Sequence, residues 1–316
     1  MKTVLCSLLT FVVFFSLNAQ YTESDFREYK KLNDQETRLS AYKDTDDMLR
    51  LKLQQLDVIN KSRKRYRAKP VKLDILASRV ANKQSQEAAE GEFRGHWNLR
   101  GEKPYHRYAF AGGRDHVTEN AAATWMTGGS FDMRPETYSK LMVDLHGQFM
   151  AEKKPHDGHK QTVIQKDHNY VGIGCFMTKS QFRYYEEFVD RYADIADVPL
   201  RFSPGQEFSI DIKPYDNKYL YYAVAYYEKA PKPISQKEAN RKSSYPDYTN
   251  DAAVTFAPWD LSKYRDTSGT YSVPWSFSKK GTYYIQMLVD AKDPSNVNSF
   301  NTEGKIVATG VVVRVE

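Results

Sequence analysis

All seven histidines of this 316-residue chain fall between residues 96 and 168, and this clustering is the first sign of chemistry in the sequence. Imidazole is the side chain that exchanges protons near neutral pH, and it is a common ligand of zinc and other transition metals. The cluster therefore predicts a metal site or an acid–base site in this window. The histidines are His96, His106, His116, His146, His156, His159 and His168.

The sequence lacks the common local signatures of catalysis. It contains no His-Glu-x-x-His pair, no paired Cys-x-x-Cys, no glycine-rich phosphate loop and no Gly-x-Ser-x-Gly elbow. Each of these motifs sets ligands or nucleophiles at a fixed spacing on one element. A common zinc protease and a nucleotide-binding enzyme are therefore disfavoured. A Ser-His-Asp set assembled from distant residues stays open.

Two ordered motifs lie between residues 73 and 174. The first comprises Leu73-Asp74, Ala88-Ala89, Gly95-His96-Trp97-Asn98, Gly101-Glu102-Lys103-Pro104-Tyr105, Ala111-Gly112-Gly113 and Thr118-Glu119-Asn120-Ala121-Ala122. The second comprises Phe149, Glu152, Asp157-Gly158-His159, the apolar stretch that ends at Ile164, and Val171-Gly172-Ile173-Gly174. Over roughly residues 47–195 this pattern resembles the bacterial CAP superfamily (cysteine-rich secretory, antigen 5, pathogenesis-related). Thr118 stands where the family usually has glycine. The local turn can therefore differ from that of the family, whereas the carboxylate of Glu119 is retained.

The resemblance implies a polar cleft built from His96, Glu119, Glu152 and His159. Glu152 stands where bacterial relatives often carry serine. In the family the two histidines can share a divalent ion, often zinc, while carboxylates hold water around it. His96 and His159 are then the metal ligands, and Glu119 or Glu152 is the candidate catalytic base that deprotonates a bound water. Without metal, the same groups form two charge-stabilised His–Glu pairs.

The other histidines and the nearby aromatic residues have less specific interpretations. His106 competes with His96 for the first ligand position, although His96 matches the family loop better. We expect His156 in a turn, His146 on a helix face, and His116 and His168 at the surface or around the site. Trp97, Tyr105 and Tyr108 either line a ligand groove or pack the loop that carries them.

The N-terminus indicates export. Lys2 precedes an apolar run over residues 4–17, and Ala19 is a small residue suited to cleavage. This pattern predicts a signal peptide over residues 1–19, and no later stretch is apolar enough for a transmembrane helix. Removal of the leader leaves Cys175 as the only cysteine, in an apolar strand where a buried, inert thiol is expected. We therefore expect a secreted or periplasmic bacterial protein without an intramolecular disulfide.

The charge of the chain gives little support to a nucleic-acid partner. The net charge is +6, and acidic residues are interleaved with basic ones. The densest basic run, residues 61–67, has the chemistry to contact phosphates, but cations are also favoured at helix C-termini. We interpret this run as a solvated helix end.

The elements that position these residues divide the chain in two. A polar lead-in over residues 20–46 is expected to be mobile or helical. Apolar spacing then predicts helices from residue 47 into the basic run, over residues 73–90, over 119–125 and over 135–152. A loop over residues 91–118 and strands over 170–177 and 182–188 complete this domain. The order predicts an α+β fold, a layered α–β–α domain over residues 47–195.

Residues 196–316 have a different pattern, in which β-branched and aromatic residues alternate with polar ones. The predicted strands cover residues 208–212, 220–227, 271–277, 283–289 and 306–315. They indicate an antiparallel β-sandwich of immunoglobulin-like type, with a long polar insertion around residues 229–251. Trp259 and Trp275 either form a carbohydrate- or peptide-binding face or pack within the sandwich.

Three functions are compatible with the sequence. The first is binding of an extracytoplasmic ligand, such as a lipid, a sterol or an envelope polymer, with a divalent metal as the implied cofactor. The second is a metal-assisted hydrolase of peptides or esters, which uses Glu119 or Glu152 as the base. The third is a non-catalytic interaction module whose sandwich binds an unidentified protein partner. Because one fold serves many functions, the site has to decide between them.

Overall fold

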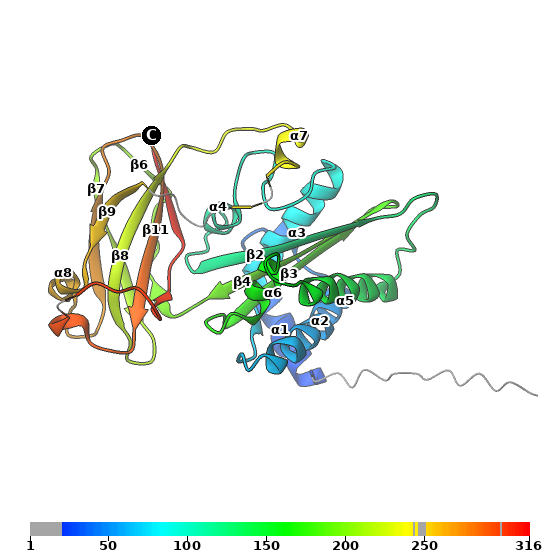
Figure 1. Cartoon of the computed structure of the whole chain (residues 1–316), viewed down its shortest axis with the longest axis horizontal. Coiled ribbons are helices and arrows are strands. Elements are labelled where there is room, and N and C mark those ends of the chain that lie inside the picture. The colour runs from blue at the N-terminus through cyan, green and yellow to red at the C-terminus, as the bar shows by residue number, and fades with distance from the viewer. Residues whose placement is uncertain (1–20, 243, 246–250, 298) are drawn as a thin grey trace, which may run out of the picture.

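The computed structural model shows a layered helix–sheet domain beside an all-β domain (Figure 1). It describes residues 21–242, 244–245, 251–297 and 299–316. The predicted signal peptide over residues 1–19 lies outside the described residues. Within the described part of the chain, no helix combines the length and the apolar character needed to cross a membrane.

A four-stranded sheet in the order β1-β3-β4-β2 forms the middle layer of the N-terminal domain. Strand β1 runs parallel to β3, and the β3–β4 and β4–β2 pairs are antiparallel. The elements are α1 (Glu23–Gln35), η1 (Ser40–Tyr42), α2 (Asp46–Arg65), β1 (Lys72–Leu73), α3 (Ile75–Glu90), α4 (Pro104–Phe110), β2 (His116–Trp125), α5 (Pro135–Ala151), α6 (Gly158–Ile164), β3 (Tyr170–Met177) and β4 (Gln181–Asp190).

Side-chain alternation along the strands buries both faces of this sheet. On one face, Ile173 and Tyr184 share a core with Phe26 of α1, Leu56 of α2 and Phe149 of α5. On the other face, the glycines of β3 lie against α3, so closely that a Cβ on Gly174 would stand 2.2 Å from the backbone carbon of Ala81. The sheet therefore lies between two helical layers, and the predicted α–β–α layering is confirmed.

Two expectations for secondary structure in this domain are wrong. Residues 119–125 form part of β2 and not a helix, because each of them pairs with a residue of the buried strand β4. This pairing outweighs the helix propensity of the three alanines at 121–123. The expected loop over residues 91–118 contains the helix α4, which begins at a proline, as helices often do. The short helix α6 was not anticipated from the sequence.

The lead-in and the basic run both belong to the folded domain. Thr22 and Asp25 form a capping box that starts α1, and Phe26 of this helix is buried in the core. Residues 61–65 of the basic run form the end of α2, as interpreted from the sequence, and Tyr66 and Arg67 follow the helix. One member, Arg63, is buried and donates to the carbonyl oxygens of Val163 and His168, so it joins α2 to the segment that follows α6.

The C-terminal domain consists of two sheets around a shared core. One sheet has the order β10-β7-β5, and the other has the order β6-β13-β11-β8-β9 with β12 paired to β11. Trp275 lies inside the core, whereas Trp259 is 49% exposed, so the two do not share a binding face. The elements are β5 (Ala193–Ile195), β6 (Arg201–Phe202), β7 (Glu207–Pro214), β8 (Tyr219–Glu228), α7 (Gln236–Ala239), β9 (Ala252–Phe256), α8 (Pro258–Leu261), η2 (Ser262–Tyr264), β10 (Tyr271–Ser276), β11 (Gly281–Asp290), η3 (Pro294–Asn296), β12 (Ile306–Val307) and β13 (Val311–Val315).

The two domains are in extensive contact. The ring of Tyr105 stacks on that of Tyr284, with centroids 4.1 Å apart, inside an apolar cluster that both domains build. The segment between β8 and β9, which corresponds to the polar insertion predicted from the sequence, reaches across to the N-terminal domain. Its helix α7 lies over the loop that follows α3 (Figure 1), and Ala239 packs with Phe93 and Tyr185.

Candidate functional site

The predicted site residues lie around β2, which is the edge strand of the N-terminal sheet. Consecutive residues of a strand point to opposite faces, and at an edge both faces can be reached by neighbouring segments. The carboxylate of Glu119 accepts a hydrogen bond from His96 Nδ1 at 2.8 Å. The next residue, Asn120, donates from Nδ2 to the backbone oxygen of His159 at 3.0 Å. Two consecutive residues of β2 thus hold the two segments that carry the histidines.

The second His–Glu pair lies between α5 and α6. His159 Nδ1 donates to Glu152 Oε1 at 2.5 Å. The other oxygen of Glu152 accepts from the backbone N–H groups of His159 and Lys160, at 3.0 and 3.3 Å. The ring of Phe149 stacks on the ring of His159 with centroids 4.8 Å apart. Glu152 therefore fixes both the ring of His159 and the start of the helix that carries it.

The two pairs face each other, with the ring centroids of His96 and His159 6.3 Å apart. Both rings present Nδ1 to a carboxylate, so a shared metal would be bound through the Nε2 atoms. An ion about 2 Å from each Nε2 atom lies roughly 3 Å from each ring centroid, so tetrahedral coordination of a shared ion would need the two rings to approach by about 1 Å. Carboxylates on the other ring nitrogen are the usual partners that orient metal-binding histidines. In the part of the chain that the structure describes, no set of three or more His, Cys, Asp or Glu side chains is arranged to hold a metal.

Arg107 is a member of the site that sequence reasoning missed. Its guanidinium contacts Glu119 Oε2, and Nη1 donates to the backbone oxygen of His96 at 2.6 Å. Opposite Glu119 in the β2–β4 pairing lies Glu187, whose pKa is raised well above its usual value by burial and by the charge of Glu119. Burial also raises the pKa of Glu119, and Arg107 opposes that rise. Because the guanidinium of Arg107 is nearest to Glu119, we assign the ionised form to Glu119 and the protonated form to Glu187.

Tyr245, which belongs to the C-terminal domain, is the second residue missed. Its ring centroid is 4.5 Å from that of His96. Its hydroxyl accepts from the backbone N–H of Glu119 and donates to the backbone oxygen of the same residue at 3.0 Å. The side chains of His96 and Glu119 are 10% and 0% exposed, compared with 35% and 23% for His159 and Glu152. One half of the site is covered and the other half is open to solvent.

The remaining histidines lie elsewhere. His106 contacts Glu228 of the C-terminal domain at 3.1 Å and does not take the place of His96. His116 and His168 are both buried and donate to the two oxygens of Asp190, at 2.9 and 2.6 Å. His146 of α5 is buried between Glu186 and Ser62, and His156 is exposed in the turn between α5 and α6. Of the aromatic residues, Tyr105 and Tyr108 are buried in packing contacts.

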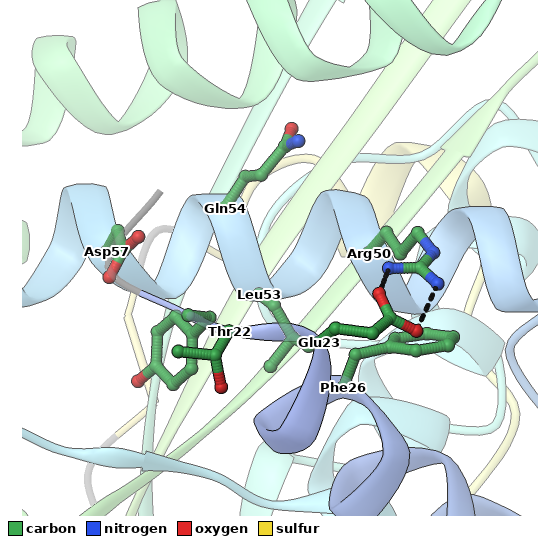
Figure 2. Close-up of a pocket in the computed structure, with 8 residues that line it drawn as sticks. Thr22, Glu23, Phe26, Arg50, Leu53, Gln54 and Asp57 are labelled. Carbon is green, nitrogen blue, oxygen red and sulfur yellow. Dashed lines mark hydrogen bonds and ion pairs between the residues drawn. The ribbon is translucent and has the colours of Figure 1, made fainter. Parts of the chain in front are cut away.

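Two cavities are relevant to ligand binding. A small one of about 130 Å³ lies between α1 and α2, where the carboxylate of Glu23 is paired with the guanidinium of Arg50 (Figure 2). It is lined by none of the four predicted site residues. A larger cleft of about 620 Å³ lies between the domains and is lined by Trp97, which follows His96, and by side chains of the insertion.

Residues 56–189 match the model of the cysteine-rich secretory protein family, CAP. This segment is a CAP domain. The match runs from α2 to β4 and contains all four predicted site residues together with Arg107. Tyr245 and the rest of the insertion lie outside the CAP domain, so the covered half of the site is closed by a part of the chain that the family model does not include.

Two solved structures are similar to this chain. An extracellular protein containing a SCP domain from Bacillus anthracis str. Ames is 17% identical, with a TM-score of 0.34 over 44% of this chain and 39% of that chain. The chain thus spans about two fifths of that protein's length. An outer surface protein from Borrelia burgdorferi is also 17% identical, with a TM-score of 0.35 over 46% of this chain and 94% of that chain. A comparison with curated proteins found no match.

Proposed function

We propose that this protein is exported and binds an extracytoplasmic ligand through a divalent ion held by His96 and His159. The observation that supports the proposal is the pair of imidazole rings, 6.3 Å apart, each with its Nδ1 bound to a glutamate. Neutral imidazoles suit zinc, and a site with two protein ligands leaves coordination positions for groups of a ligand. Glu119 and Glu152 then act on the ion indirectly, because they orient the two rings.

We assign the rest of the ligand to the interdomain cleft, which is lined by Trp97 but by none of the four candidate site residues. Its volume of about 620 Å³ lies within the usual range for small-molecule sites. Among the residues that line it are Trp97, next to His96 in sequence, four lysines and three acidic residues: Lys103, Lys229, Lys232, Lys242, Glu228, Glu238 and Asp251. The cleft thus offers a ligand an aromatic ring and charges of both signs.

The geometry supports binding more than hydrolysis. A metal-assisted hydrolase needs a carboxylate or imidazole in reach of the water that it deprotonates. The Glu119 carboxylate is buried between His96 and Arg107. The Glu152 carboxylate accepts hydrogen bonds from His159 and from two backbone N–H groups. Both acids are therefore engaged in positioning the histidines and their segments.

The test is a calorimetric titration of metal-free protein with zinc chloride. We expect one zinc ion per chain and at least about tenfold weaker binding for His159→Ala, because half of the protein ligands are lost. The matched control is His156→Ala, which removes an exposed histidine from the same turn. Equal zinc binding by the wild type and His159→Ala, or no zinc binding by the wild type, contradicts the proposal.

A further inference from the structure

A segment of the C-terminal domain covers the His96 half of the site through several specific contacts. Tyr245 lies against the ring of His96, and its hydroxyl bridges the backbone N–H and C=O of Glu119. Glu119 belongs to an edge strand, and among the described residues no strand pairs with its outward side. The hydroxyl of Tyr245 fills this role at the residue that also holds His96.

The residues that precede Tyr245 in the segment are anchored to the loop that carries His96. Trp97 Nε1 donates to the backbone oxygen of Ser244 at 3.0 Å, and the ammonium of Lys242 lies 4.2 Å from the centroid of the same indole ring. Nearer to α7, the side chain of Asn240 accepts from the backbone N–H of Arg94 at 2.8 Å. The segment is thus fixed to the loop at several points, and Tyr245 has a defined position over His96.

We propose that Tyr245 controls access to His96, so that the C-terminal domain determines what can reach this half of the site. The inference extends the proposed function, because His96 is one of the two proposed metal ligands. It stands on the contrast in exposure between the two imidazoles: His96, against whose ring Tyr245 lies, is 10% exposed, and His159 is 35% exposed. A ligand that needs both histidines has to displace or accommodate the tyrosine ring.

The test measures the accessibility of each histidine without any metal. Full-length, metal-free protein is treated with diethylpyrocarbonate, and the rate of modification of each histidine is followed by mass spectrometry. We expect His159 to react faster than His96 in the wild type. In Tyr245→Ala, His96 is expected to react about tenfold faster or more, because a ring contact and a hydroxyl that bridges two backbone groups are both lost. Tyr245→Phe keeps the ring and loses only the bridge, so its rate is expected between the other two.

Two controls separate access from general loosening of the fold. Tyr219→Ala removes a half-buried tyrosine at the start of β8. Glu228 and the domain contact lie at the other end of this strand, so the substitution should leave the modification rate of His96 unchanged. The exposed His156 should react at the same rate in all variants. An unchanged rate at His96 in Tyr245→Ala overturns the inference, as does an equal rise at every histidine. Since no metal is present, this outcome is independent of whether the protein binds zinc.

Discussion

Replacing Glu228 by glutamine should weaken the contact between the two domains and change how stability depends on pH. Glu228 is the last residue of β8 and is buried against the N-terminal domain. Its Oε1 accepts from Lys103 Nζ at 3.0 Å and from the hydroxyl of Tyr105, and its Oε2 lies 3.1 Å from His106 Nε2. Burial alone would raise the pKa of Glu228, but His106, Lys103 and Tyr105 outweigh burial and lower it to about 2.

The size of the effect follows from this pKa. A fall from 4.5 to about 2 corresponds to roughly 3 kcal/mol of stability at neutral pH. Part of this stabilisation of Glu228 would require a charged His106. Burial, however, lowers the pKa of His106, and its Nδ1 accepts a hydrogen bond from the backbone N–H of Lys103. The ring is therefore neutral at pH 7, and its Nε2 lies 3.1 Å from Glu228 Oε2 without adding a charge to the contact. We accordingly expect about 2 kcal/mol from the ionised carboxylate.

The sign of the pH dependence follows from the depressed pKa. The folded protein holds the carboxylate ionised more strongly than the unfolded chain does, so the contribution is complete above about pH 4.5 and is lost as the pH falls towards 2. Urea unfolding of wild type and Glu228→Gln at pH 7, 5, 4 and 3 measures the difference in unfolding free energy. We expect about 2 kcal/mol at pH 7 and a smaller difference at pH 3. The exposed Glu303→Gln is the control, and a difference that stays constant between pH 7 and pH 3 would refute the reasoning.

Two further predictions concern the core of the CAP domain. Gly174→Ala should lower the free energy of unfolding in urea by about 1–3 kcal/mol, because a Cβ would stand 2.2 Å from the backbone of Ala81 in α3. The control is Gly147→Ala in α5, where a Cβ meets nothing within 4 Å. This variant should be neutral or slightly stabilising. Cys175 should react with a thiol reagent at pH 8 only as fast as the domain opens, because burial raises its pKa to about 12; labelling of the folded protein as fast as of the denatured chain would contradict this burial.

Local patterns predicted much of the CAP domain. The strand over residues 170–177 has the predicted bounds, and the helices α2, α3 and α5 lie where their apolar spacing placed them. The four candidate site residues could be proposed because each belongs to a motif of a few neighbouring residues, and their side chains lie near one another in the structure. Residues 119–125 were misassigned because an alanine-rich segment favours a helix locally, whereas its pairing partner, β4, lies about 60 residues away in sequence, beyond the reach of local pattern analysis.

The environment of the site could not be read from the sequence for a related reason. Tyr245 is 126 residues from Glu119, and it reaches the site in a polar segment with few apolar residues to indicate burial. Its contribution is a single hydroxyl that satisfies the backbone of an edge strand and a ring that covers one imidazole. The chemistry of the four side chains is thus encoded in the CAP motifs, whereas the difference in exposure between His96 and His159 depends on the C-terminal domain. A functional assay on this protein therefore has to include both domains, because each of them supplies part of the site.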